Sequence, residues 1–159
     1  MASLTLDRTP ERCSSADPVS GLTVVVGHDG SSAGRAAVAH AARRAGAGGY
    51  VVVVHALPLG VSPEDAERER DYATTVSALL ESVDRSSADG PSYETRVVAG
   101  PASKALLEAA QRYGADEIVL GAAANRQARG AIGCVSAAVL RHSSSPVTIV
   151  PPAPRGATP

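Results

Sequence analysis

Two short segments of the chain carry residue types that can bind a small polar ligand. The first is Gly27-His28-Asp29-Gly30-Ser31, which directly follows an apolar run rich in valine. The Asp29 carboxylate can accept hydrogen bonds from ribose hydroxyls or from an amino group. It can equally cap the next helix, because Asp-Gly-Ser is common turn chemistry. The residues alone leave both roles open.

The second segment is the loop from Gly121 to Gly133, which separates an apolar run from a short helical pattern. Glycines let backbone N–H groups approach an anion, and the helix after Gly133 directs its positive end the same way. Arg126 and Arg129 can add charge for phosphates, or they can face water on a solvated connection. The loop has neither the Gly-Lys-Ser/Thr of a P-loop nor the Gly-x-Gly-x-x-Gly of a dinucleotide site.

Catalytic and metal-binding patterns are not visible. The spacing of the four histidines makes no metal-ligand set, so packing or surface roles are expected for them. They are His28, His40, His55 and His142. The segment around Ser31 lacks the Gly-x-Ser-x-Gly order of a nucleophile elbow. We therefore do not expect an enzyme, and the residues predict no metal site.

The two cysteines, Cys13 and Cys134, predict no structural disulfide and favour a reducing, cytoplasmic location. Cys134 lies where the last helix should begin. Thiols at such positions are often reactive, which makes Cys134 a candidate redox or modification site. The alternative is a small buried residue standing in place of serine.

The elements that must position these residues alternate between apolar runs and helical patterns. Strands are predicted at Leu22 to Gly27, Tyr50 to Ala56, Tyr93 to Val98, Glu117 to Gly121, and Val147 to Val150. Helices are predicted at Ser31 to Arg44, Ser62 to about Gly90, Pro101 to Tyr113, and Val135 to Arg141. Strands so uniformly apolar are typical of a parallel sheet covered on both faces. The prediction is one doubly wound α/β domain of five strands and four helices.

The composition argues against two classes of partner, nucleic acids and membranes. The chain has no Phe or Trp, four Tyr and a net charge of -1, so stacking platforms and a basic field for nucleic acid are missing. No apolar run approaches the ~18 residues that span a bilayer. We expect neither nucleic acid nor a membrane as partner. Residues 1–20 and 152–159 are predicted to be disordered ends around a single domain at 21–151.

Several motifs, in order, resemble the universal stress protein family. They are Val26-Gly27-His28-Asp29-Gly30-Ser31, Val53-Val54-His55-Ala56, Gly100-Pro101, Asp116-Glu117-Ile118-Val119-Leu120-Gly121, and the segment from Gly133-Cys134-Val135-Ser136 to Pro146-Val147. The resemblance covers about Leu22 to Pro151. It implies a Rossmann-like sheet of strand order 3-2-1-4-5, with Asp29 beside Gly121. It also implies a homodimer formed through Val147 to Val150.

Many members of that family bind ATP, and some bind cyclic AMP or no nucleotide. The ATP-binding members share Gly-x2-Gly-x9-Gly-Ser/Thr. This chain keeps Gly121 and Gly133 but has Ala124, an eight-residue spacer and Cys134. Ala124 tolerates a close phosphate poorly, and a thiol is a weaker hydrogen-bond donor than a hydroxyl.

The resemblance therefore implies an adenine-nucleotide-binding stress-response module, with ATP as the default ligand but weak or altered affinity. The alternative is a dimeric interaction module that no longer binds nucleotide. The candidate nucleotide-binding residues are Asp29, Ala56, Gly121, Ala124, Arg126, Gly133, Cys134 and Ser136.

Overall fold

The computed structural model describes residues 21–57, 90–122 and 132–152. Within them the chain forms a five-stranded sheet of order β3-β2-β1-β4-β5, and every neighbouring pair is parallel. The strands are β1 (Thr23–Gly27), β2 (Tyr50–Leu57), β3 (Ser92–Ala99), β4 (Glu117–Gly121) and β5 (Val147–Val150). The predicted fold class and strand order are confirmed.

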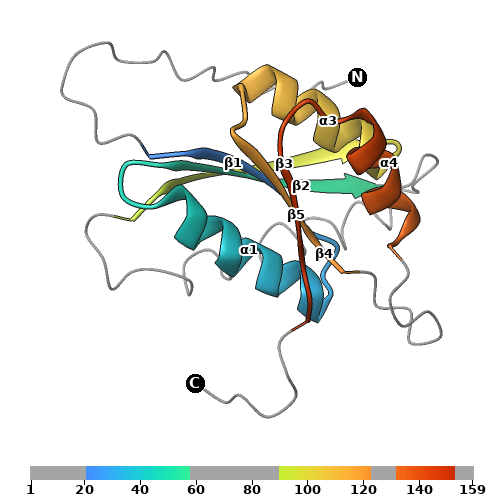
Figure 1. The fold of residues 1–159 in the computed structure, drawn as a ribbon, viewed down its shortest axis with the longest axis horizontal. Coiled ribbons are helices and arrows are strands. Elements are labelled where there is room, and N and C mark those ends of the chain that lie inside the picture. Colours follow the sequence, from blue (N-terminus) through green and yellow to red (C-terminus); the bar gives the residue numbers. More distant parts are fainter. Residues whose placement is uncertain (1–20, 58–89, 123–131, 153–159) are drawn as a thin grey trace, which may run out of the picture.

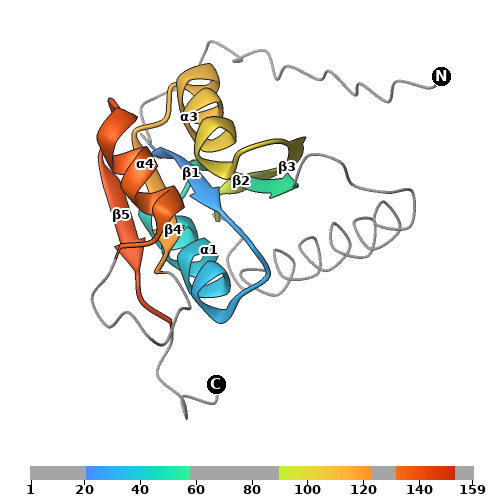
Figure 2. The same cartoon turned by 90° about the vertical axis from the view of Figure 1, so that its right-hand side faces the viewer.

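Helices cover both faces of the sheet (Figures 1 and 2). Helix α1 (Ser32–Ala45) lies on one face, while α3 (Ala102–Tyr113) and α4 (Cys134–His142) lie together on the other. The fourth predicted helix, from Ser62 to about Gly90, lies outside the described residues. The described helices and strands start or end within one or two residues of the predicted limits.

The core divides into two layers because successive residues of a strand point to opposite faces. Val24 and Val26 of β1 pack against Ala37, Val38 and Ala41 of α1. Val25, between them, belongs to the other layer, whose helical side comes mainly from α3. That side contains Ala105, Leu106, Ala109 and Ala110 of α3, with Val139 of α4. A core without Phe or Trp is thus filled by valine on the strands and alanine on the helices, which lets the helices approach the sheet closely.

The helix ends follow local sequence rules. Ser31 caps α1, since its Oγ accepts a hydrogen bond from the Gly34 N–H at 3.0 Å. Helix α3 follows Pro101 and ends at Gly114, whose positive φ of 59° closes the helix. These ends direct the N-termini of α1, α3 and α4 toward the carboxyl-terminal end of the sheet, where ligands bind in open α/β folds.

The described residues contain no helix long and apolar enough to cross a membrane.

Candidate ligand pocket at the carboxyl-terminal end of the sheet

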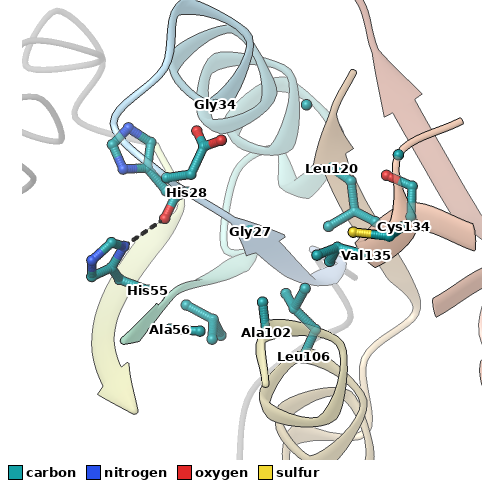
Figure 3. A pocket seen from close by; sticks show the side chains of 15 residues that line it. Gly27, His28, Gly34, His55, Ala56, Ala102, Leu106, Leu120, Cys134 and Val135 are labelled. Carbon is teal, nitrogen blue, oxygen red and sulfur yellow. Dashed lines mark hydrogen bonds between the residues drawn. The ribbon is translucent and has the colours of Figure 1, made fainter. Parts of the chain in front are cut away.

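A cavity of about 220 Å³ opens where the strands end and the helices begin. The ends of β1, β2 and β4 form its floor, and the first turns of α1, α3 and α4 form its walls. Its lining is Gly27, His28, Asp29, Gly34, Val54, His55, Ala56, Ala102, Leu106, Leu120, Gly121, Gly133, Cys134, Val135 and Ser136. Figure 3 shows His28 and His55 on one side of this pocket and Cys134 and Val135 on the other.

Six of the eight candidate residues predicted from the sequence line this one pocket. They are Asp29, Ala56, Gly121, Gly133, Cys134 and Ser136. The other two, Ala124 and Arg126, lie outside the described residues, as does Arg129. Whether any of the eight binds a nucleotide stays a prediction, but the fold brings six of them together from four separate elements.

Asp29 lines the pocket and also holds the turn that leads into α1. Its Oδ1 accepts a hydrogen bond from the Ser31 N–H at 3.0 Å, while Ser31 itself caps the helix. Of the two roles left open for Asp29, the capping role falls to Ser31, while Asp29 orders the turn before the helix. Ligand binding by Asp29 stays a prediction. Partial burial works to raise the pKa of the Asp29 carboxyl, but hydrogen bonds from Ser31 outweigh it and lower the pKa below its usual value. Asp29 is thus a carboxylate at neutral pH, with its second oxygen, Oδ2, outside this bond.

Three glycines allow the close packing around Asp29. An added Cβ on Gly121 would lie 2.6 Å from the Ala33 carbonyl carbon, so the end of β4 touches the first turn of α1. An added Cβ on Gly34 would lie 2.8 Å from Asp29 Oδ1, and one on Gly27 would lie 2.9 Å from Leu120 Cδ2. Gly27 opens the first candidate segment of the sequence, but neither Gly27 nor Gly34 was among the candidate nucleotide-binding residues. Nothing in the sequence distinguishes Gly34 from the chain's other glycines, because the need appears only when the elements meet.

The two histidines of the pocket were assigned packing or surface roles from the sequence. The His28 ring is buried, and its backbone N–H donates to the Val54 carbonyl at 3.0 Å. His55 Nδ1 lies 2.8 Å from the His28 carbonyl oxygen (Figure 3). A carbonyl only accepts, so His55 carries a proton on Nδ1. The His28–His55 pair therefore joins the ends of β1 and β2 beside the pocket.

Burial lowers the pKa of His28, despite the nearby Asp29 carboxylate, so its imidazole is neutral at pH 7. The position of both histidines at strand ends was the available sequence signal for their place at the pocket.

The start of α4 forms another wall of the pocket. Gly133 precedes the helix in an extended conformation, and Cys134 is its first residue. Cys134 is exposed, so the alternative that it is a buried replacement for serine is wrong. Ser136, one turn later, is buried with 5% of its surface exposed, and it still lines the pocket.

The described lining of the pocket lacks the basic side chains that usually neutralise phosphates. Among the described residues, its lining includes one carboxylate and two imidazoles but no lysine or arginine. No group of three or more metal-ligating side chains occurs in the described part of the chain. Polar contacts for an uncharged or hydroxyl-bearing ligand are thus present, while charge compensation for phosphates would have to come from helix N-termini or from residues outside the described ranges.

Comparison with known proteins gives the family. Residues 22–151 match the sequence model of the Universal stress protein family. The chain belongs to the universal stress protein family. No curated protein sequence matches this chain.

Solved structures of family members share the fold. UspA from Lactobacillus plantarum is 20% identical, with a TM-score of 0.66, covering 81% of this chain and 97% of that one. A universal stress protein solved in complex with cAMP is 26% identical, with a TM-score of 0.56, covering 83% and 98%. One from Archaeoglobus fulgidus in complex with dAMP is 21% identical, with a TM-score of 0.60, covering 81% and 97%.

Proposed function

We propose that this chain binds an adenine nucleotide in the pocket at the carboxyl-terminal end of the sheet, as a stress-response module in the cytoplasm. The observation that carries the proposal is the meeting of Asp29, Gly121 and the start of α4 around one cavity at the point where strand order reverses. The complexes of two relatives with cAMP and dAMP support an adenine ligand.

The described lining favours the nucleoside over the phosphates. Apolar side chains such as Leu106, Leu120 and Val135 suit a base, and the Asp29 carboxylate suits ribose hydroxyls. Phosphates would meet the N-terminus of α4, where Cys134 replaces the hydroxyl of the ATP-binding pattern. ATP, with any accompanying Mg²⁺, remains the default ligand of the family, and we infer that this chain binds it weakly.

Binding is tested by thermal shift and calorimetry with ATP, AMP, cyclic AMP and adenosine. A ligand that binds only the folded chain raises its melting temperature. Asp29→Ala should abolish the affinity. The matched control is Glu108→Ala, which removes an exposed carboxylate of α3 away from the pocket. Unchanged affinity in Asp29→Ala would contradict the site, and no binding by the unaltered chain would contradict the function.

A second function, homodimeric interaction, is favoured by β5 at the edge of the sheet. The Ile118 N–H donates to the Pro146 carbonyl and the Ala122 N–H to the Val150 carbonyl, so by alternation Ile149 turns its backbone groups away from β4. An edge of this kind can pair with a second copy. We infer a homodimer through Val147–Val150.

Sedimentation across micromolar concentrations tests the dimer. The unaltered chain should have twice the monomer mass, and Ile149→Pro, which removes one outward N–H, should weaken the association. A monomer at every concentration would contradict the inference.

A further inference from the structure

The strand β3 forms the edge of the described sheet opposite β5, and it is the longer of the two edge strands. It has eight residues where β5 has four, and the two strands lie on opposite sides of the molecule (Figure 2). A strand at an edge presents a row of backbone N–H and C=O groups with which another strand can pair. The side chains of β3 therefore decide which kind of strand fits there.

The backbone groups of every second residue of β3 face away from the sheet. The Ser92 N–H donates to the Gly49 carbonyl at 2.8 Å. Eight residues later, the Gly100 N–H donates to the Leu57 carbonyl at 2.8 Å. Because backbone groups alternate in direction along a strand, the even-numbered residues of β3 bond to β2. Thr95, near the middle of β3, therefore turns its N–H and C=O outward.

Two opposite charges flank Thr95 along the strand. Tyr113 of α3 donates a hydrogen bond to Glu94 and accepts one from Arg96 at 2.8 Å, so both charged side chains lie on the α3 face of the sheet. The Arg96 side chain is 33% exposed and that of Glu94 is 25% exposed, so both also reach the surface. Val97, on the other face, is an exposed apolar side chain. The edge thus carries one acid and one base, two residues apart.

A second copy of β3 complements this edge in one antiparallel register. With Thr95 opposite Thr95 of the second copy, each Glu94 lies opposite an Arg96. Opposite charges and paired threonines are favourable cross-strand neighbours, whereas like charges directly opposite are destabilising. Centring the contact one residue earlier would place Glu94 opposite itself, and one residue later would place Arg96 opposite itself. Charge therefore selects the register centred on Thr95.

The backbone directions agree with that register. Because Thr95 turns both backbone groups outward, two copies of it can exchange both hydrogen bonds across a twofold axis. A contact of this kind uses the same surface on both chains and closes after two copies.

We propose that β3 is a second self-association edge of this chain, which pairs antiparallel with β3 of another copy about a twofold axis at Thr95. The edge at β5 lies on the other side of the sheet, so a chain that pairs through both edges contacts two copies at once. Glu94 and Arg96 already bond within their own chain, so the contact should need higher protein concentrations than pairing through β5. The inference does not depend on a nucleotide.

Disulfide trapping tests the register. In the full chain with Cys13→Ser and Cys134→Ser, Thr95→Cys places one thiol on the proposed twofold axis. The Cα atoms of a hydrogen-bonded antiparallel pair lie about 5.5 Å apart, a distance that a disulfide spans. In a mixture of oxidised and reduced glutathione this chain should form a covalent dimer, which non-reducing electrophoresis and mass spectrometry measure.

Val97→Cys in the same background is the matched control. Val97 is 41% exposed, so a thiol there is accessible. In the proposed register the two copies of this position are offset by about four residues, or about 13 Å along the strands, which is too far for a disulfide. We expect the Thr95→Cys chain to cross-link at least about tenfold faster, because only its thiols meet within the contact. Equal rates, faster cross-linking by Val97→Cys, or no cross-link by Thr95→Cys would overturn the proposal.

Thr95→Lys tests the contact without a thiol. The two added charges would face each other across the twofold axis, and lysine on an edge strand opposes pairing. In sedimentation at rising concentration, the unaltered chain should reach a larger mass than Thr95→Lys. Gln111→Lys adds the same charge at an exposed position of α3 and should behave as the unaltered chain does. Equal masses for all three chains would contradict the β3 contact.

Ile149→Pro separates the two edges. It removes an outward N–H of β5 and leaves β3 unchanged, so Thr95→Cys should cross-link at the same rate in its presence. Loss of the cross-link would show that it depends on pairing through β5, and the independent β3 edge would be wrong. Failure to bind any nucleotide would contradict the proposed function and leave these results as they are.

Discussion

The two ends of the sheet are built from different chemistry. At the amino-terminal end, charged and phenolic side chains bond to one another. Glu94 accepts hydrogen bonds from the hydroxyls of Tyr50 and Tyr113, and Arg96 donates to Tyr113 at 2.8 Å. At the carboxyl-terminal end the pocket is lined by glycine, alanine and aliphatic side chains, with few polar groups. One end is closed by its own interactions, and the other is left open for a ligand.

A second polar group strengthens the closed end. Glu117, at the start of β4, is buried, and it accepts hydrogen bonds from Arg44 Nε at 2.7 Å and from Thr148 Oγ1 at 2.5 Å. It thereby connects α1, β4 and the edge strand β5. Asp116 accepts from the Thr23 N–H at 2.8 Å and so joins the starts of β1 and β4.

Stability and ligand binding therefore depend on opposite ends of the sheet. Substitutions at the amino-terminal end should lower the free energy of unfolding without changing a ligand's affinity for the folded state. Substitutions around the pocket should change the ligand's affinity and leave the free energy of unfolding nearly the same.

Glu94→Ala should be the most destabilising of these changes. It removes the acceptor shared by Tyr50, Tyr113 and Arg96 and leaves a cation beside two phenols. Hydrogen bonds to a charged group contribute about 1.5–3 kcal/mol each, and partial exposure reduces this, so we expect a total loss of about 3 kcal/mol. Urea unfolding measures it. Glu108→Ala, at an exposed carboxylate, should change the free energy of unfolding by less than about 0.5 kcal/mol.

Nucleotide affinity is the second readout for Glu94→Ala. It should match that of the unaltered chain at a temperature where both are folded. A large loss of affinity would break the proposed separation of the two ends.

Glu117→Gln should lower the free energy of unfolding by about 1–3 kcal/mol, because it weakens two hydrogen bonds and the ion pair to Arg44. Arg44 is half exposed, so its charge can be hydrated once the pair is lost. Burial works to raise the pKa of Glu117, but hydrogen bonds from Thr148 and Arg44 outweigh it and lower the pKa.

The lowered pKa of Glu117 determines how the free energy of unfolding changes at acidic pH. The unfolded carboxyl takes up protons at a higher pH than the folded one, so the Glu117 contribution is complete above the unfolded pKa of about 4.5 and is lost as pH falls through the folded pKa. Unfolding free energy measured from pH 7 to pH 3 should fall less steeply in Glu117→Gln. An identical slope in both chains would contradict this role.

The sheet was predictable because its signal is local. Uniform valine runs such as Val24 to Val26 indicate buried parallel strands, and Gly114 marks a helix end without knowledge of the fold. The family motifs then gave the strand order, which placed Asp29 near Gly121.

The rest of the site depends on contacts between distant segments. Gly34 matters because Asp29 lies against it, and Glu117 is satisfied by Arg44 and Thr148, which are far away in sequence. A buried glutamate inside an apolar run gives no hint of its partners. The exposure of Cys134 depended on how the start of α4 meets the pocket, which the residue type does not determine.

Gly34→Ala should change the pocket end of the sheet and leave the amino-terminal end as it is. Alanine favours the helix by about 1 kcal/mol over glycine, while its Cβ would lie 2.8 Å from Asp29 Oδ1 and 3.3 Å from the Asp29 backbone nitrogen. The higher helix propensity of alanine raises the free energy of unfolding, and the close contacts of its Cβ lower it. Both of these contacts displace the Asp29 carboxylate. We expect a small change in unfolding free energy and about a tenfold to hundredfold loss of nucleotide affinity, equivalent to about 1.4–2.7 kcal/mol. Calorimetry and urea unfolding on the same sample decide it, and unchanged affinity would mean that Asp29 does not need its present position.

The smallest expected effect concerns the phosphate side of the open end. Combining Ala124→Gly with Cys134→Ser restores the glycine and the hydroxyl of the ATP-binding pattern. The new hydroxyl is a better donor to an anion than a thiol, so ATP affinity should rise by about 1–2 kcal/mol, for one or two hydrogen bonds to a charged group. Adenosine has no phosphate to gain from them, so its affinity should rise less. Titration of both ligands into both chains measures the difference. Equal gains for ATP and adenosine would place the defect in the nucleoside part of the pocket.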